Sequence, residues 1–303
     1  NVRLGTNGNI SSWMGEDEGL EWGSGFSIAS YKNKLNWQTS INYSQSTWRD
    51  DLFLVRTVGS ETYNQVTKEP YDPDNLSIGG SLDYYLNDNH AIGIGGRIDK
   101  RKSTRTAISS TIISDASQSN SLLTENSFNR DRANFNINPY YEYKTDSEKL
   151  VLDFNYVDFE NNSTNTLFDI PGSTIPFTDR KYNQEGTFEI KTYRLDYSKT
   201  ISDNLKLSAG TRYADVTTDN DLQSLDNITG DFNMIDEESS RFIVDETIFA
   251  VYSKANASLG KWSLSVGLRY ENSNTQGTST FLENGLLATK IKRRPIKKIF
   301  PSA

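Results

Sequence analysis

The sequence predicts an all-β protein, an antiparallel up-and-down transmembrane β-barrel of about 12 strands. Three observations predict this fold. Apolar and polar residues alternate along most of the chain, short and long connections alternate between these segments, and aromatic residues recur at a fixed distance from the short connections.

The composition excludes two other classes of protein. Only 35% of the 303 residues are apolar and the mean hydropathy is −0.65. No apolar run approaches the roughly 20 residues that a membrane helix needs. A disordered chain is poor in aromatic residues, whereas this one has 16 Tyr, 14 Phe and 5 Trp. The rings therefore indicate a folded protein that is not a helical membrane protein.

The alternation is clearest in two segments, 35–44 and 262–271. In the second, Trp262, Leu264 and Val266 begin a series that ends at Tyr270, and small or polar residues stand between them. A period of two places such a series on one face of a β-strand. Similar ladders occupy 76–86, 92–99, 135–143, 150–157, 205–213 and 248–255. Taken singly, each ladder also fits a half-buried strand of a soluble sandwich.

One segment, 188–197, changes phase. Phe188 and Ile190 occupy even positions, and Tyr193 and Tyr197 occupy odd ones. One inserted residue would produce this change, so the sequence predicts a β-bulge near Lys191 and Thr192.

The connections fall into two classes that alternate. Short polar turns lie at 32–34, 87–89, 145–147, 202–204 and 258–260, and they recur every 55 to 58 residues. Long polar stretches lie between the hairpins, at 47–75, 100–132, 158–185 and 215–245, and we expect them to be loops. Short turns at one rim and long loops at the other are typical of outer-membrane barrels. The final strand is expected to return after Asn284 and Gly285.

Aromatic residues give a test of the membrane model. Tyr43, Tyr156, Tyr213 and Tyr270 each stand about nine residues beyond a short turn, which is roughly 30 Å of strand or about 23 Å of height at a ~40° tilt. That height matches an apolar band of ~25 Å between aromatic girdles. Trp37 and Trp262, just after their turns, are predicted to form the other girdle.

Little in the sequence points to catalysis, a metal or a cofactor, and we predict no enzyme. There is no cysteine, and the only histidine, His90, follows a short turn. A zinc site or a catalytic triad therefore lacks its parts. The glycines of 93–96 lie inside a strand ladder, so we expect them to make room in the lumen or to bend the strand. The net charge of −8 disfavours nucleic acid as a partner.

Ligand contacts are expected in the long polar stretches. Trp48, Tyr63, Tyr71 and Phe177 stand there among polar neighbours. Aromatic rings beside amide groups suit sugars or peptides. The same rings also suit a purely structural role, in which they pack the loops together.

Two segments resemble a known family. The stretch Gly267-Leu268-Arg269-Tyr270-Glu271, followed by Phe300-Pro301-Ser302, resembles TonB-dependent receptors, in particular the outer-membrane β-barrel family of Bacteroidetes. The opening, with residues 4–8 and 26–37, is similar to the start of such barrels after their plug domain. The resemblance implies a barrel of 22 strands, and residues 1–303 would be its N-terminal part, without plug or TonB box.

The resemblance also implies a function. The protein is expected in the cell outer membrane, in contact with its lipid, as a receptor that imports an extracellular siderophore, oligosaccharide or peptide, with TonB coupled through a plug domain. The alternative is a secreted or surface all-β adhesin without transport, and detergent dependence would separate the two.

Overall fold

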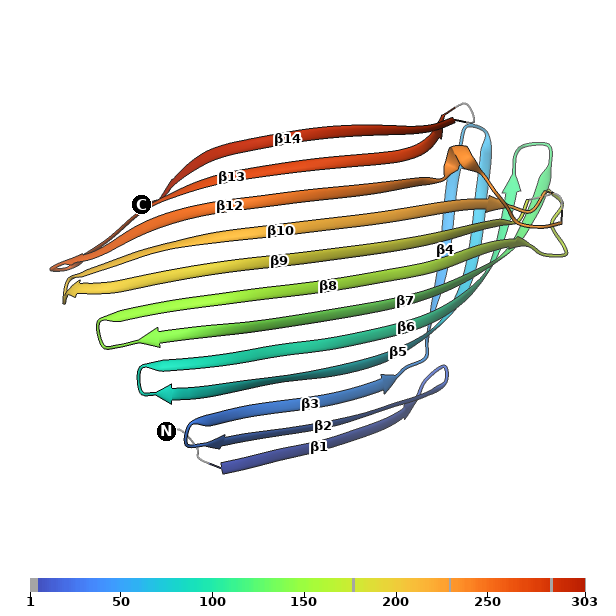
Figure 1. Cartoon of the computed structure of the whole chain (residues 1–303). Helices are drawn as coiled ribbons and strands as arrows, with labels where there is room; N and C mark the ends of the chain where they lie inside the picture. The colour runs from blue at the N-terminus through green and yellow to red at the C-terminus, as the bar shows by residue number, and fades with distance from the viewer. Residues whose placement is uncertain (1–4, 176–177, 229, 284–285, 303) are drawn as a thin grey trace.

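The computed structural model describes residues 5–175, 178–228, 230–283 and 286–302, and β-strands make up almost all of this part of the chain (Figure 1). The strands are β1 (Gly5–Glu16), β2 (Leu20–Lys32), β3 (Leu35–Gln45), β4 (Trp48–Val58), β5 (Glu61–Asn87), β6 (His90–Ser114), β7 (Ser119–Lys144), β8 (Glu148–Asp169), β9 (Arg180–Ser202), β10 (Leu205–Asp226), β11 (Asn233–Met234), β12 (Ser240–Leu259), β13 (Trp262–Glu283) and β14 (Leu286–Ser302). A 3-10 turn, η1 (Asp236–Glu238), precedes β12. None of the helical structure in the described ranges is long and apolar enough to cross a membrane.

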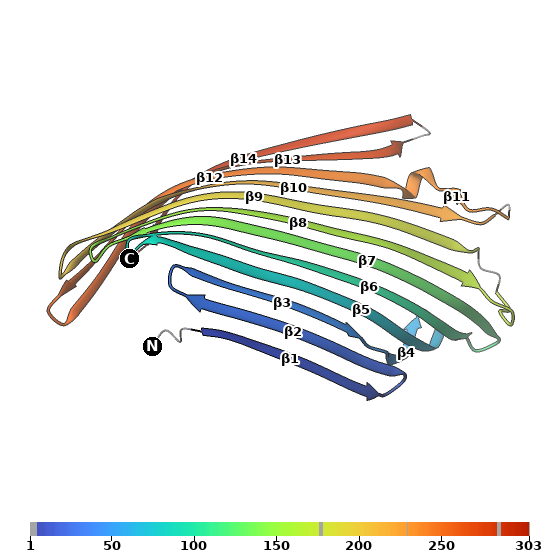
Figure 2. The ribbon, with the colours of Figure 1, turned by 60° about the horizontal axis from the view of Figure 1, so that its bottom comes forward.

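All strands belong to one antiparallel sheet in which neighbours in the chain are neighbours in space (Figure 1). Twelve strands form the main path, from β1 through β14, while β4 pairs with β5 and β11 pairs with β10 off this path. This confirms the all-β antiparallel prediction and the expected meander. Within the described residues, β1 and β14 each pair on one side only. The sheet is curved along its strands (Figure 2).

The short turns lie where the sequence predicts them. Each falls between two strands of a hairpin, as at 33–34 between β2 and β3 and at 260–261 between β12 and β13. Asn33 has a φ of 50° and Gly260 a φ of 65°. Asparagine and glycine are the residues that adopt this left-handed conformation at least cost. These two residues therefore permit the tight turns at which the chain reverses.

The long polar stretches are not loops, and this prediction was wrong. Most of their residues continue the strands: β5 has 27 residues, β6 has 25 and β7 has 26. These extensions are mostly polar on both faces, with a few apolar residues such as Ile108 and Ile112 of β6, so alternation gives little signal there. Their backbone groups are nevertheless paired, as in the register from Arg101–Arg132 up to Ser114–Ser119.

One group of extensions changes direction. The β4 hairpin, the adjoining part of β5 and the joined ends of β6 and β7 run across the direction of the other strands (Figure 1). Pairing between β5 and β6 is interrupted between Lys68–Ile108 and Tyr71–Arg105. Pro70 lies in this interruption and has no N–H to donate to a neighbouring strand. The bend therefore begins beside Tyr71.

The predicted β-bulge near Lys191 and Thr192 is also wrong. Both residues pair in unbroken register, with Asp215 and Ala214 on β10, and the only shift between β9 and β10 is at Leu205. Phe188 and Ile190 simply lie on the other face of the sheet. There they pair with Phe159 and Val157 of β8, respectively, and so belong to an apolar patch on that face.

The two faces of the sheet differ in chemistry. Following the register from strand to strand, one side, the apolar face, carries the large apolar residues of every ladder, including Ile41, Ile78, Ile94, Leu152, Tyr193, Leu207, Phe249, Val266 and Ile299. Many of these side chains are exposed, with Val266 at 49% and Leu207 at 42%. Burying them in a bilayer would be favourable because apolar surface leaves water.

The opposite side, the polar face, carries mainly Ser, Asn, Gly and charged residues. The buried alanines Ala91, Ala107, Ala214 and Ala250 all lie on it. Side chains converge on the inside of a curved sheet and diverge on the outside, so the polar face is the concave one. A concave polar face and a convex apolar face are the arrangement of a barrel with a wet lumen.

Candidate ligand-binding surface

Tyrosines lie across glycines on the polar face. The Tyr140 hydroxyl donates to an Asp83 carboxylate oxygen at 2.7 Å, and its ring lies over Gly93, where a Cβ would overlap it. Tyr252 likewise reaches Asp196 across Gly210. Glycine permits this close approach because it has no side chain. Gly93 therefore makes room in the interior, as the sequence predicted.

Ion pairs continue along this face, farther from the short turns. Arg97 donates to Asp99 at 2.8 Å, and Arg269 donates to Glu271 at 2.8 Å. Both pairs join positions two apart on one strand, which share a face. The charges in this part of the polar face are therefore largely matched.

A second group of charges, nearer the long ends of the strands, is different. We define the arginine cluster as Arg101 and Arg105 of β6 with Arg130 and Arg132 of β7. Arg101 lies directly opposite Arg132, Arg130 opposite Ser103, and Arg105 opposite Tyr71 of β5. All four residues lie on the polar face.

The contacts of the arginine cluster are mostly uncharged. Arg101 Nη2 donates to the Tyr71 hydroxyl at 2.9 Å, and Arg132 Nε donates to Asn161 Oδ1 at 3.0 Å. Arg105 forms an ion pair with Glu69 at 2.5 Å. The guanidinium carbon of Arg105 also lies over the Tyr71 ring, 4.8 Å from the ring centroid. Tyr71 is thus the aromatic centre of a cationic surface.

Two pKa shifts reflect this crowding. The pKa of Arg130 is lowered by burial first and then by the neighbouring charge of Arg132. Burial alone would raise the pKa of Tyr71, but the pKa is lowered because Ser103 and Arg101 donate hydrogen bonds to its hydroxyl. The phenol oxygen is therefore an acceptor within a positive environment.

The structure brings together two of the four residues predicted to bind ligand. Trp48 pairs with Tyr71 in the β4–β5 register, and their ring centroids are 5.3 Å apart. Tyr63 lies on the same strand as Tyr71 but eight positions away, where its hydroxyl donates to Glu61 at 2.7 Å. Phe177 lies outside the described residues.

The arginine cluster was missed by the sequence reasoning because segment 100–132 was expected to be a loop. Its signal is present nevertheless. Arg97, Arg101 and Arg105 stand four apart, which places them on one face if the ladder of 92–99 continues.

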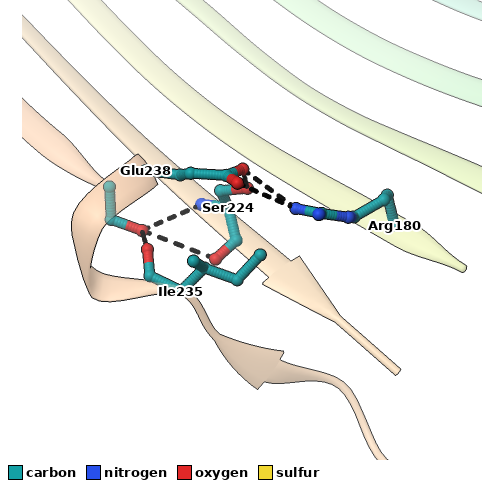
Figure 3. Close-up of polar contacts among 5 residues, drawn as sticks. Arg180, Ser224, Ile235 and Glu238 are labelled. Atoms are coloured by element: carbon teal, nitrogen blue, oxygen red, sulfur yellow. Dashed lines mark hydrogen bonds and ion pairs between the residues drawn. The ribbon is translucent and has the colours of Figure 1, made fainter. Parts of the chain in front are cut away.

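A network of polar contacts fixes one connection at the long-strand rim (Figure 3). Arg180 Nη1 donates to Glu238 at 2.9 Å, and the buried Ser224 hydroxyl donates to the same carboxylate at 2.9 Å. Ser239 links the backbone of Ser224 to that of Ile235, with distances of 3.0 and 2.8 Å. The pKa of Glu238 is lowered, first by the Ser224 hydrogen bond and then by Arg180. These contacts attach η1 to β9 and β10.

The only histidine lies far from these groups. His90 begins β6 beside a short turn, on the apolar face, where it pairs with Tyr143. Its Nδ1 is 2.6 Å from the Tyr141 hydroxyl. In the described part of the chain, no three His, Cys, Asp or Glu side chains are grouped closely enough to hold a metal ion.

Comparison with known proteins identifies the family. The model of the "Outer membrane protein beta-barrel family" matches residues 141–303, more than half of the chain. The chain therefore belongs to this family, and its location is the outer membrane, in contact with outer-membrane lipid. A search of curated proteins found no match.

Several solved structures are similar at low identity. The outer membrane protease OmpT from Escherichia coli is 13% identical, with 88% of this chain and 97% of that chain covered and a TM-score of 0.29. A FadL homologue from Pseudomonas aeruginosa is 11% identical, with 92% and 77% covered and a TM-score of 0.31. The ferric citrate transporter FecA is 9% identical, with 91% and 55% covered and a TM-score of 0.33.

Proposed function

We propose that the protein is an outer-membrane receptor that admits an extracellular ligand through a polar lumen. The observation that carries this proposal is the division of a single sheet into a continuous apolar face and a concave polar face. A soluble sandwich would cover its apolar face with a second layer, but the described residues form one sheet. The large apolar side chains are thus free to contact lipid.

The register supports a membrane girdle. The residues that pair in register can be followed from Tyr43 on β3 across β5, β6 and β7 to β8. On β8, four strands away, this line reaches Glu160, which is four residues farther from the short turn than Tyr156. The same line reaches Thr278 of β13, eight residues beyond Tyr270 after eight strands. Relative to this line of paired residues, the tyrosines are therefore displaced toward the short turns by one residue per strand.

This stagger has a simple geometric meaning. A step of about 3.3 Å along the strand for every ~4.8 Å between strands corresponds to a tilt of roughly 35°. Strands tilted by this angle would hold Tyr43, Tyr156, Tyr213 and Tyr270 at one height. Trp37 and Trp262 lie on the same face near the short turns and would form the other girdle.

The energy source and the ligand are part of the proposal. The resemblance of Gly267-Leu268-Arg269-Tyr270-Glu271 to TonB-dependent receptors supports TonB coupling through a plug, and import of a siderophore, oligosaccharide or peptide. In that case β1 and β14 pair with further strands of a 22-stranded barrel, and residues 1–303 form its N-terminal part. Backbone groups at a lipid-facing edge need such partners.

We propose no enzymatic reaction for this chain. A rim-located protease would need a histidine beside carboxylates at the long-strand end, and His90 lies at the opposite end on the apolar face. The competing function is a surface adhesin that binds without transport. Such a protein would need no lipid around its apolar face.

Labelling of single cysteines in intact cells tests the proposal. The chain has no cysteine, so Ser60→Cys at the tip of the β4 hairpin and Asp203→Cys in a short turn introduce unique thiols. We expect a membrane-impermeant maleimide to label Ser60→Cys in intact cells and Asp203→Cys only after permeabilisation. Labelling of both in intact cells, with release of the protein by alkaline carbonate, would favour the adhesin.

A further inference from the structure

The arginine cluster brings together four positive charges, of which one is matched in an ion pair. Arg101 and Arg132 are directly opposite each other, which is destabilising for like charges on neighbouring strands. Among the described residues, only Arg105 of the four forms an ion pair, with Glu69. Two more carboxylates of this face lie nearby: Asp50, opposite Glu69 on β4, and Asp99, which already accepts from Arg97. The cluster therefore has excess positive charge.

The cluster also has unused hydrogen-bond donors. The Nε atoms of Arg101, Arg105 and Arg130 are buried and have no partner among the described residues. A buried donor without a partner costs free energy. Guanidinium groups pair best with planar or tetrahedral oxyanions, to which they donate two hydrogen bonds each. An oxyanion would therefore offset both the charge and the unsatisfied donors.

There is room for a ligand beside the cluster. A groove of 470 Å³ borders it on the polar face and is lined in part by Asn42, Asn75, Arg97 and Arg101. The groove is level with Tyr43, which also lines it, and the cluster lies on the long-strand side of the tyrosines proposed as a girdle. A solute that enters from outside would reach it before the membrane-spanning part of the lumen.

We infer that the arginine cluster, with Tyr71, binds a soluble ligand that carries several carboxylate or phosphate groups. The inference rests on the proposed import function and specifies the chemical class of its ligand. Lipid phosphates are excluded as the occupant because the cluster lies on the face opposite the apolar one. Trp48, whose ring is tilted against that of Tyr71, extends the site with an aromatic surface for the uncharged part of the ligand.

Calorimetry with two soluble probes, inorganic tripolyphosphate and propane-1,2,3-tricarboxylate, tests this site on the full-length protein in detergent. The test variant is R101Q/R130Q. The matched control is K102Q, which removes one positive charge from the same strand on the opposite face, where Lys102 pairs with Asp131. We expect at least one probe to bind, with an affinity that falls about tenfold or more in R101Q/R130Q and changes less than about twofold in K102Q.

Two further measurements make the result decisive. R101K/R130K keeps both positive charges but not the paired donors of the guanidinium groups. We expect its affinity to lie between those of the wild type and R101Q/R130Q. Such binding would also show that the fold tolerates substitution at these two positions. Which probe binds distinguishes phosphate from carboxylate. Absence of binding by both probes, or an equal loss in K102Q, would overturn the anion site. If the cysteine labelling still shows a membrane-spanning protein, only the site fails, and the receptor proposal stands.

Discussion

At the scale of single residues, Glu238 shows how one carboxylate attaches a rim segment to the sheet. Its pKa is lowered from the usual 4.5, chiefly by the Ser224 hydroxyl and then by Arg180. A group with a lowered folded pKa stabilises the fold above its unfolded pKa and loses that contribution as the pH falls through the folded value. The contact is therefore fully present at neutral pH and lost in acid.

Hydrogen exchange measured by mass spectrometry tests this link. We expect amides in segment 230–239, after correction for intrinsic rates, to lose protection as the pH falls below about 4.5 and through the lowered pKa of Glu238, where the carboxylate becomes protonated. E238Q should have reduced protection already at pH 7. E237Q makes the same charge change at a neighbouring exposed residue and should behave as the wild type. An unchanged pH profile in E238Q would refute the assigned role.

Also at this scale, the sequence revealed some site residues and concealed others. Trp48 and Tyr71 were recognisable as aromatic residues among polar neighbours, and the structure places their rings in contact. The arginine cluster was not recognisable because Arg101 and Arg132 are distant in the chain, and only the β6–β7 register places them opposite each other. The composition of two strands does not determine which of their residues lie opposite each other.

At the scale of elements, β13 allows a comparison of the two faces at adjacent positions. Val266 lies on the apolar face and is 49% exposed, whereas Ser265 lies on the polar face opposite Asn256. We expect Val266→Arg to lower the free energy of unfolding in lipid by about 2 to 4 kcal/mol, because a lipid-facing charge loses its hydration. Ser265→Arg should cost less than about 1 kcal/mol, since a wet lumen hydrates the guanidinium. Denaturant titration in bilayers measures both, and equal losses would contradict the assignment of faces.

The same elements show where sequence patterns end. Ladders such as 262–270 predict strands because lipid requires apolar residues at alternate positions. Outside the apolar band both faces of a strand meet water, so β7 carries Asn129, Arg130 and Asp131 in succession without alternation. Those segments are strands because the neighbouring hairpins offer backbone partners. Local patterns therefore located the membrane-facing part of each strand and missed its extension.

At the scale of the whole molecule, the register predicts how the sheet stands in the bilayer. If the strands are tilted by roughly 35°, Tyr43, Tyr156, Tyr213 and Tyr270 lie at one depth; if they stand upright, the eight-residue stagger spreads them over about 26 Å. Because the chain has no cysteine, each tyrosine can be replaced singly by cysteine and labelled with a nitroxide. We expect accessibility to oxygen and to a water-soluble relaxant to give four depths within about 4 Å of one another, near the headgroups. Depths that change steadily from Tyr43 to Tyr270 would show that these rings do not form a girdle. The strands would then lack the tilt that barrel closure requires, even though the sheet has an apolar face.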